Sequence, residues 1–339
     1  MIFMRKTGCL LLLAFSFLLC ACSKAGYKRS DFFVMDTYAF VIADCNDEKI
    51  LSDLKNEVLR IEKIFSATYE GSEIQNLFSE NKKISDETKN LLEKADAISQ
   101  NTGGFFDYTL GSIIKLWDVN GEKQKVPDNE KIIKELSNCG YENITFSDDG
   151  IVSQNPDILI DLGAIAKGYA GQKVCEMLKS RGIENAAVSL GGNVTVIGTS
   201  KETDGGWDVG IKNPFDDSSE IIGKVFVSDK TVSVSGSYER FFEKDGVKYH
   251  HIFDRRTGYP SDSDLSSVAV ISEDGALADA LSTALFVMGY EKALEFYSSG
   301  IYQFEAIFCK TDGFVYVTDA ILDKFTPQKS VSVKFPQYD

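Results

Sequence analysis

An aspartate lies inside an apolar segment near the C-terminal end of the sequence. Residues 278–288 are ADALSTALFVM, a pattern that predicts a largely buried helix around Asp279. A carboxylate buried there needs a partner. Thr283 follows four residues later, so both side chains share a helix face and present oxygens suited to Mg²⁺ or Ca²⁺. Two oxygens do not complete a coordination sphere, and an Asp279 bonded to an arginine or a backbone amide is the alternative.

A second candidate site lies at residues 158–169, ILIDLGAIAKGY. This pattern predicts a buried strand that ends at Asp161 and turns through Gly163 into a helix. The amides and the positive dipole end of such a helix attract a phosphate, and Lys167 could reach the same anion. Carbonyl groups of the turn could complete a metal site. Alternatively, Asp161 caps the helix and Lys167 is a solvated charge.

The two histidines of the chain are adjacent, within residues 249–260, YHHIFDRRTGYP. Histidine transfers protons near neutral pH. In a strand, His251 and Phe253 would share one face and His250 and Asp254 the other, so at most one histidine would face a given site. A packed or exposed histidine pair is the alternative.

Two short loops carry aromatic residues. Residues 101–111, NTGGFFDYTLG, could stack on a flat ring while Asp107 accepts hydrogen bonds from that ring. Residues 65–73 place Tyr69 in a polar loop, where it could also stack. Either loop could instead cover apolar surface, and spacing does not decide between these interpretations.

The elements that would position these residues follow from hydrophobic periodicity and turn residues. We predict a strand at 32–43, helices at 49–65, 86–100, 165–180 and 276–288, an extended polar region at 120–150, and strands from 186 onward. Strands and helices mix without a regular βαβ rhythm. We therefore expect an α+β fold, with residues 31–339 forming one large domain of two packed lobes and residues 22–30 forming a linker.

Residues 1–21 have the features of a signal peptide. Arg5 and Lys6 precede an apolar stretch at 10–19, which is too short to span a bilayer comfortably. Cys22 follows a small residue, as at a bacterial lipoprotein cleavage site, so we expect a lipidated N-terminus. An ordinary secretory peptide or an uncleaved anchor is the alternative. The expected location is outside the cytoplasm, on the periplasmic face of the inner membrane or the cell surface.

The charge of the chain bears on which macromolecules it can bind. Without the leader, 34 basic and 51 acidic residues give a net charge of −17, which argues against binding to nucleic acid. The cysteines at 45, 139, 175 and 309 have no metal-ligand spacing.

Taken together, six segments resemble the ApbE family of FAD:protein FMN transferases. They are Val-Met-Asp-Thr at 34–37, Thr-Tyr at 68–69, Gly-Phe-Phe-Asp at 104–107, Asp-Leu-Gly-Ala-Ile-Ala-Lys-Gly-Tyr at 161–169, His-His-Ile-Phe-Asp at 250–254 and Ala-Asp-Ala-Leu-Ser-Thr at 278–283. The chain departs from the family at two positions. Asp36 replaces the usual glycine, and Arg255 stands where proline is common, a change that we expect to alter only the stiffness of the turn.

The resemblance implies a set of site residues. Contacts with FAD are implied for Met35, Tyr69, Phe105, Phe106, Asp107, Asp161, Lys167 and Phe253. The Ala164 carbonyl, Asp279 and Thr283 would hold Mg²⁺, and His251 would take the proton from an attacking hydroxyl.

The implied reaction moves FMN from FAD to a serine or threonine of an exported or membrane redox protein and releases AMP. FAD pyrophosphatase activity, with water replacing the hydroxyl, is one alternative. A flavin-binding lipoprotein without catalysis is the other.

Overall fold

The computed structural model describes residues 26–45, 47–79, 84–121, 124–147, 150–215, 220–329, 331–334 and 336. The predicted leader and Cys22 lie outside these residues. A strand begins at Tyr27, within the segment that we predicted as a linker up to residue 30. Within the described ranges, no helix is both long enough and apolar enough to cross a membrane.

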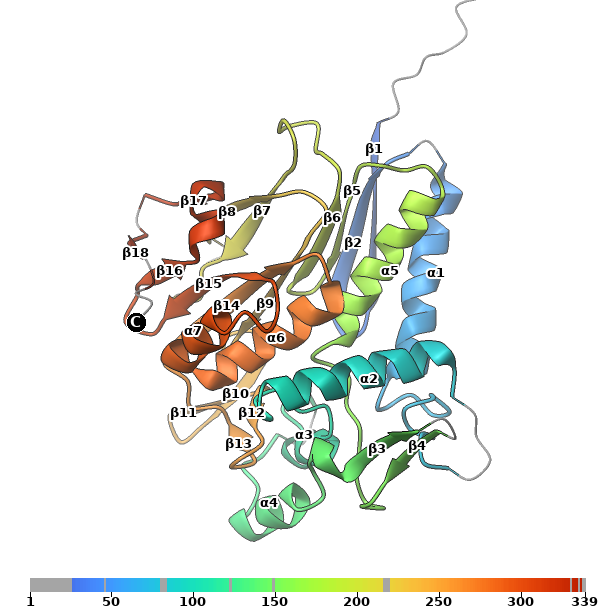
Figure 1. Ribbon diagram of the computed structural model, residues 1–339, viewed down its shortest axis with the longest axis vertical. Helices are drawn as coiled ribbons and strands as arrows, with labels where there is room; N and C mark the ends of the chain where they lie inside the picture. Colours follow the sequence, from blue (N-terminus) through green and yellow to red (C-terminus); the bar gives the residue numbers. More distant parts are fainter. Residues whose placement is uncertain are drawn as a thin grey trace, which may run out of the picture.

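A nine-stranded sheet forms the centre of the molecule (Figure 1). Its order is β1 (Tyr27–Val34), β2 (Thr37–Asp44), β5 (Ala186–Leu190), β6 (Asn193–Ile197), β9 (Thr231–Gly236), β14 (Leu265–Ser272), β15 (Glu305–Lys310), β16 (Val315–Val317) and β18 (Val333–Lys334). Neighbouring strands are antiparallel except for β16 and β18. All five residues of β5 are buried, as expected for a strand covered on both faces.

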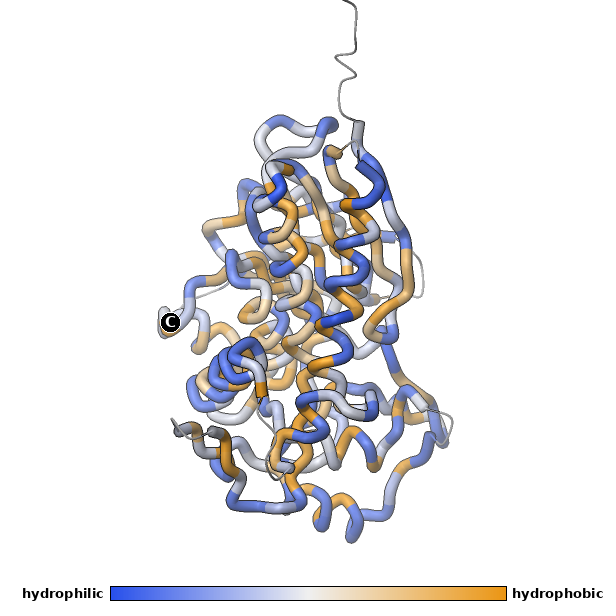
Figure 2. The backbone as a smooth tube through the Cα atoms, turned by 90° about the vertical axis from the view of Figure 1, so that its right-hand side faces the viewer, coloured by the Kyte–Doolittle hydropathy of each residue, from blue (hydrophilic) through white to orange (hydrophobic). Residues whose placement is uncertain are grey.

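Different elements pack on the two faces of this sheet. Helices α1 (Glu48–Phe65), α5 (Ala166–Ser180) and α6 (Gly275–Met288) form one layer, in which α5 and α6 contact the central strands. The three-stranded sheet of β7 (Trp207–Lys212), β8 (Ile221–Val227) and β17 (Phe325–Pro327) shares a separate apolar cluster with the other face. In Figure 2 hydrophilic and hydrophobic residues alternate along several helices, as expected for elements with one buried face.

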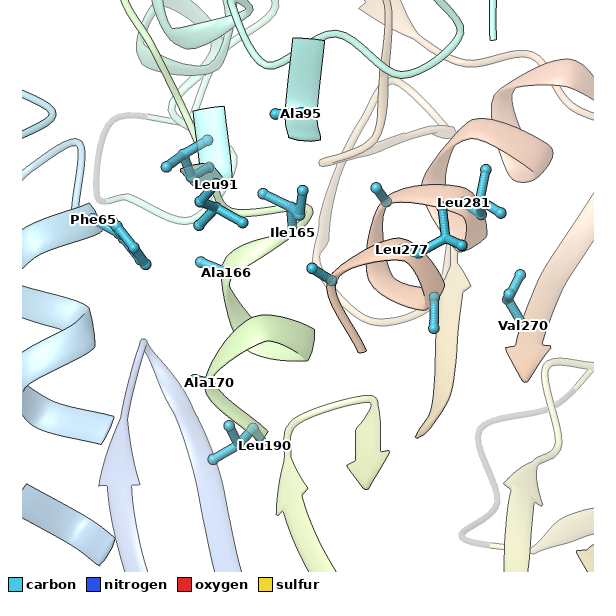
Figure 3. Packing of buried hydrophobic residues seen from close by; sticks show 14 of the residues in the cluster. Phe65, Leu91, Ala95, Ile165, Ala166, Ala170, Leu190, Val270, Leu277 and Leu281 are labelled. Carbon is cyan, nitrogen blue, oxygen red and sulfur yellow. The ribbon is translucent and has the colours of Figure 1, made fainter. Parts of the chain in front are cut away.

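A second lobe lies below the sheet in Figure 1. It contains α2 (Asp86–Asn101), α3 (Gly111–Trp117), α4 (Asn129–Leu136) and the hairpin of β3 (Ile144–Ser147) and β4 (Gly150–Ser153). Trp117, Ile132 and Phe253 share a small apolar cluster there. The larger cluster joins α1, α2, α5 and α6, and Figure 3 shows Leu91 and Ala95 of α2, Ile165 beside α5, and Leu277 and Leu281 of α6 within it.

The four predicted helices are confirmed, with ends that differ by at most one residue. The mixed α+β architecture is also confirmed. Two predictions are wrong in detail, and one helix was not predicted. The single strand at 32–43 is a hairpin of β1 and β2, the extended region at 120–150 contains α4, a 3₁₀ turn at Tyr141–Asn143 and a strand, and α7 (Tyr290–Ser298) follows α6.

The α5 and α6 helices cross at two glycines. A Cβ on Gly168 would lie 2.0 Å from the carbonyl oxygen of Gly275, and a Cβ on Gly275 would lie 2.4 Å from that of Gly168. Both distances are far below van der Waals contact. Glycine at these positions therefore permits the close approach that brings Asp279 to the first turn of α5.

We expect Gly168→Ala to lower the free energy of unfolding by about 3 kcal/mol, because the two helices must separate to admit the methyl group. Urea unfolding measures this change. Gly26→Ala is the control, since an added Cβ there has no atom within 4 Å. An unchanged free energy of unfolding in Gly168→Ala would show that the crossing is not tight.

Candidate functional site

The carboxylate of Asp279 is buried and accepts three hydrogen bonds. Its Oδ2 accepts a hydrogen bond from the amide of Gly168 at 2.9 Å. Its Oδ1 accepts bonds from Asn193 Nδ2 at 3.1 Å and Ser233 Oγ at 3.3 Å. The helix that carries Asp279 begins at an N-cap, Asp274, whose side chain accepts from the Leu277 amide. Asp279 thus joins α6, α5, β6 and β9 at one point.

The residues around Asp279 supply further oxygen atoms. Asn193 is 3% exposed, and its Oδ1 has no hydrogen-bond partner among the described residues. Its orientation follows from chemistry, since the amide nitrogen and not the oxygen must face a carboxylate. An unpartnered buried acceptor beside a carboxylate suits a cation or a donor ligand.

The other two predicted metal ligands lie on the elements that meet at Asp279. Thr283 is half-buried on α6, with its hydroxyl 3.3 Å from that of Ser235. Ala164 belongs to the turn that leads into α5. Across the described ranges, no group of three or more His, Cys, Asp or Glu side chains could hold a metal. A cation here would therefore depend on one carboxylate and on neutral oxygens, the donor set that hard cations accept.

The turn before α5 is ordered by its own residues. Asp161 Oδ1 accepts from the Gly163 amide at 2.8 Å, and Lys167 Nζ donates to the Gly163 carbonyl at 2.8 Å. Asp161 therefore caps this turn, and the α5 N-cap, Ile165, makes no side-chain hydrogen bond. Burial raises the pKa of Asp161, while the Gly163 amide and the Lys167 charge oppose that rise. The Asp161 amide also donates to the Tyr108 carbonyl, so this turn lies beside the aromatic loop.

The two histidines have different environments. His250 is buried, its Nε2 bonds the Ser261 carbonyl at 3.0 Å, and its Nδ1 accepts from the Ile252 amide. Both of its nitrogens are therefore used within the fold. The His251 Nδ1 lies 3.2 Å from the Arg240 carbonyl. A carbonyl oxygen can only accept, so Nδ1 carries the hydrogen and Nε2 keeps its lone pair.

His251 is neutral over the physiological pH range. Desolvation, together with the charges of Lys167 and Arg240, lowers its pKa to about 3, although the Arg240 carbonyl opposes the change. Among the residues that the structure describes, Nε2 has no hydrogen-bond partner. A neutral imidazole with a free lone pair can accept a proton.

Arg240 connects His251 to the β1–β2 turn, because its guanidinium donates to the Asp36 carbonyl at 2.7 Å. Met35 and Asp36 both have left-handed backbones, with φ of 51° and 54°, as a two-residue hairpin turn requires. Aspartate tolerates this conformation, which explains how Asp36 can stand where the family usually has glycine. The Met35 amide donates to Glu62 of α1 at 2.6 Å.

Sequence reasoning missed Glu239, which precedes Arg240. A Cβ on Gly192 would lie 3.0 Å from Glu239 Oε1, so the carboxylate lies close to the β5–β6 turn. The surrounding chain desolvates this carboxylate and raises its pKa, while Lys167, Arg240 and Lys212 oppose the rise. No spacing in the sequence relates Glu239 to Lys167 or to the turn.

Three of the residues predicted to contact flavin have side chains that the structure places elsewhere. Phe106 is 2% exposed, and Phe253 is 6% exposed with its ring 5.8 Å from that of Trp117. The Asp107 side chain is fully buried beside Arg255. Core packing and an ion pair occupy these side chains in this conformation, and their implied contacts with FAD stay predictions.

Phe105 and Tyr69 lie nearer to solvent. The Phe105 ring is half-buried, with the guanidinium of Arg256 at 4.5 Å and the ammonium of Lys292 at 5.3 Å from its centroid. These cations cover a ring that we expected to stack on flavin. Tyr69 is 49% exposed in the loop after α1.

Comparison with known proteins gives one family. The ApbE family model matches residues 35–308. An FAD:protein FMN transferase of Treponema pallidum is 36% identical over 218 residues, which cover 60% of each chain. One of Klebsiella pneumoniae is 37% identical over 204 residues, covering 60% of this chain and 62% of the relative. The chain thus spans about 60% of the length of these curated relatives.

Two solved structures show the same fold. The ApbE protein of Thermotoga maritima has a TM-score of 0.80 and 32% identity, covering 88% of this chain and 99% of that one. The flavin transferase ApbE from Vibrio cholerae has a TM-score of 0.77 and 25% identity, covering 88% and 100%.

Proposed function

The chain belongs to the ApbE family, and from this premise we propose that it is an FAD:protein FMN transferase. The proposed reaction moves FMN from FAD to a serine or threonine hydroxyl of an acceptor protein. The observation that carries the proposal is His251, a neutral imidazole with a free Nε2. A carrier that merely stores FAD has no use for such a base.

In the proposed mechanism, His251 Nε2 takes the proton of the acceptor hydroxyl. The hydroxyl oxygen attacks the phosphorus of the FMN half of FAD, the bond from that phosphorus to the bridging oxygen breaks, and AMP leaves with that oxygen. The Arg240 carbonyl holds His251 in the tautomer that this step needs. The proton then passes from His251 to solvent.

The residues around Asp279 fit a divalent cation. Asp279, Thr283, the Ala164 carbonyl and the unpartnered Asn193 Oδ1 would hold Mg²⁺ or stand next to it. When bound, the cation would polarise the diphosphate and neutralise developing charge. Lys167 and the turn from Asp161 to Gly163 would bind and orient the same diphosphate. The other predicted FAD contacts stay predictions: Met35, Tyr69, Phe105, Phe106, Asp107 and Phe253.

Hydrolysis of FAD to FMN and AMP is the second candidate. A Tyr69 ring over the flavin would restrict water and favour transfer, and this ring is 49% exposed and accessible to a ligand. Without a bound acceptor, water could replace the hydroxyl at the same phosphorus. The balance between transfer and hydrolysis depends on how well the bound acceptor excludes water.

One assay distinguishes these functions. The chain without residues 1–22 is incubated with FAD, Mg²⁺ and an exported redox protein that carries a candidate serine or threonine, and protein-bound flavin fluorescence and AMP are followed. Labelled acceptor together with AMP supports transfer. AMP without labelled acceptor supports hydrolysis. If neither product forms, the remaining interpretation is a lipoprotein that binds flavin without catalysis.

We also propose that the protein is exported and anchored through a lipid on Cys22. The support is the leader sequence, residues 1–21, and the small residue before the cysteine. We expect Cys22→Ala to move the protein from the membrane fraction to the soluble or culture fraction. Unchanged fractionation would contradict the anchor.

A further inference from the structure

Arg255 joins three segments of the second lobe. It follows β12 (Phe253–Asp254), and its Nε lies 3.2 Å from Asp107 Oδ2. Its two terminal nitrogens each donate to Glu142, both at 2.8 Å. One side chain thus links the turn after the histidines to the aromatic loop and to the 3₁₀ turn.

The guanidinium occupies a space that two glycines provide. A Cβ on Gly104 would lie 2.9 Å from Arg255 Nη1, and a Cβ on Gly140 would lie 3.1 Å from Nη2. The guanidinium carbon is also 5.2 Å from the centroid of the Tyr141 ring. A planar, forked cation fits this space better than an ammonium does.

Asp107, the inner partner, has no access to water because its side chain is 0% exposed. Its Oδ1 accepts from the amide of Thr109 at 2.8 Å and from the hydroxyl of Thr109 at 2.6 Å. Its Oδ2 is 3.4 Å from the Tyr141 amide and faces Arg255. Removing a partner from a buried charge is strongly unfavourable.

The linked segments are those that the proposed reaction uses. The Asp161 amide bonds the Tyr108 carbonyl, so the Asp107 loop lies beside the proposed diphosphate turn. His251 lies four residues before Arg255. We propose that Arg255 is a positioning residue that fixes the histidine segment relative to the diphosphate turn through the buried carboxylate of Asp107. The expected effect of Arg255 on catalysis rests on the proposed function, whereas its effect on the structure around Asp107 does not.

The structural test is the pH dependence of unfolding. Burial raises the pKa of Asp107 from 3.8, and Arg255 opposes this rise. In Arg255→Met the pKa of Asp107 rises further, so the folded protein binds a proton that the unfolded chain releases. The free energy of unfolding should therefore fall as pH rises from about 4 through the raised pKa, more steeply than in the unmodified protein.

Among the other ionisable groups around this pair, burial also raises the pKa of Asp96, which accepts from the Tyr108 hydroxyl. Asp96 contributes to the slope in the unmodified protein as well, so its contribution cancels when the two profiles are compared. Burial raises the pKa of Tyr108, Cys139 and Tyr141, so they stay neutral in this range. Desolvation would raise the pKa of Glu142, but the hydrogen bonds from Arg255 lower it overall. Without Arg255 the desolvation of Glu142 is unopposed, so Glu142→Gln is also combined with Arg255→Met, and the slope that remains in this double variant is that of Asp107.

The functional test measures FAD affinity by flavin fluorescence and turnover with the acceptor. Arg255→Met should weaken FAD binding about tenfold and lower turnover about a hundredfold, since misplacing a catalytic group is costly. The variant Arg255→Met with Asp107→Asn removes both charges, so the steep pH dependence of Arg255→Met should disappear. Arg181→Met, which removes a surface ion pair with Asp53, is the matched control.

The proposal is overturned if Arg255→Met has the pH profile and FAD affinity of Arg181→Met. If Arg255→Met does not fold, the double neutral variant decides, because its failure to restore folding would also overturn the proposal. If the unmodified protein neither binds FAD nor transfers FMN, the proposed function fails, and the unfolding profiles still decide whether Arg255 holds Asp107.

Discussion

Asp279→Ala should reduce metal-dependent turnover about a thousandfold, because it removes the one carboxylate that we assign to the cation, worth about 4 kcal/mol in the transition state. The same change leaves the Gly168 amide, Asn193 and Ser233 without their acceptor. The free energy of unfolding should therefore fall by about 3 kcal/mol. Turnover is measured as AMP release over a Mg²⁺ titration.

A direct binding measurement separates metal loss from instability. Mg²⁺ should raise the melting temperature of the unmodified protein but not that of Asp279→Ala. Asp229→Ala, which breaks a surface ion pair with Lys179, is the matched control and should keep the Mg²⁺ response. Unchanged turnover and an unchanged Mg²⁺ response in Asp279→Ala would refute the assigned metal site.

His251→Ala should lower FMN transfer about a thousandfold while FAD affinity stays the same, because general bases contribute about 10²–10⁴-fold. In the unmodified protein the base is active when neutral. A pKa of about 3 means that the acidic limb of kcat/KM should lie far below pH 6.5. The measurement is the initial rate of acceptor labelling at fixed ionic strength across the acidic range.

The neighbouring histidine is the control. His250→Asn breaks the bond to Ser261 and should lower stability, while transfer falls less than about tenfold, since both of its nitrogens serve the fold. Both histidines have a lowered pKa in the folded protein, so below pH 6.5 they are protonated in the unfolded chain before they are protonated in the folded one. The free energy of unfolding should therefore fall as pH falls. Equal loss of transfer in the two variants would contradict the choice of His251.

The helix that carries Asp279 could be predicted because its apolar pattern and its N-cap are local. The partners of Asp279 could not be predicted, since Gly168, Asn193 and Ser233 lie 111, 86 and 46 residues away in the sequence. The same holds for Asp107. Its residue type suited a ring ligand, and nothing local showed that Arg255 would bury it. We expected Arg255 to change only turn stiffness, and its ion pairs show that this was wrong.

Short elements were also hard to predict. α4 has eight residues and one buried side chain, Ile132, so its apolar pattern was too weak to separate it from an extended polar region. The hairpin at Met35 and Asp36 did have a signal, an aspartate between two alternating apolar runs. Glu239 had none, because its surroundings are set by the β5–β6 turn.

The long sequence separations around Asp279 also bear on when activity arises during folding. Contacts between distant segments form late, after the loops between them have closed. The central sheet and the crossing of α5 with α6 must both exist before these two helices and the strands β6 and β9 meet at this carboxylate. In a partly folded chain these contacts of Asp279 are not yet formed. Catalytic activity should therefore appear in a single step, together with the completed fold.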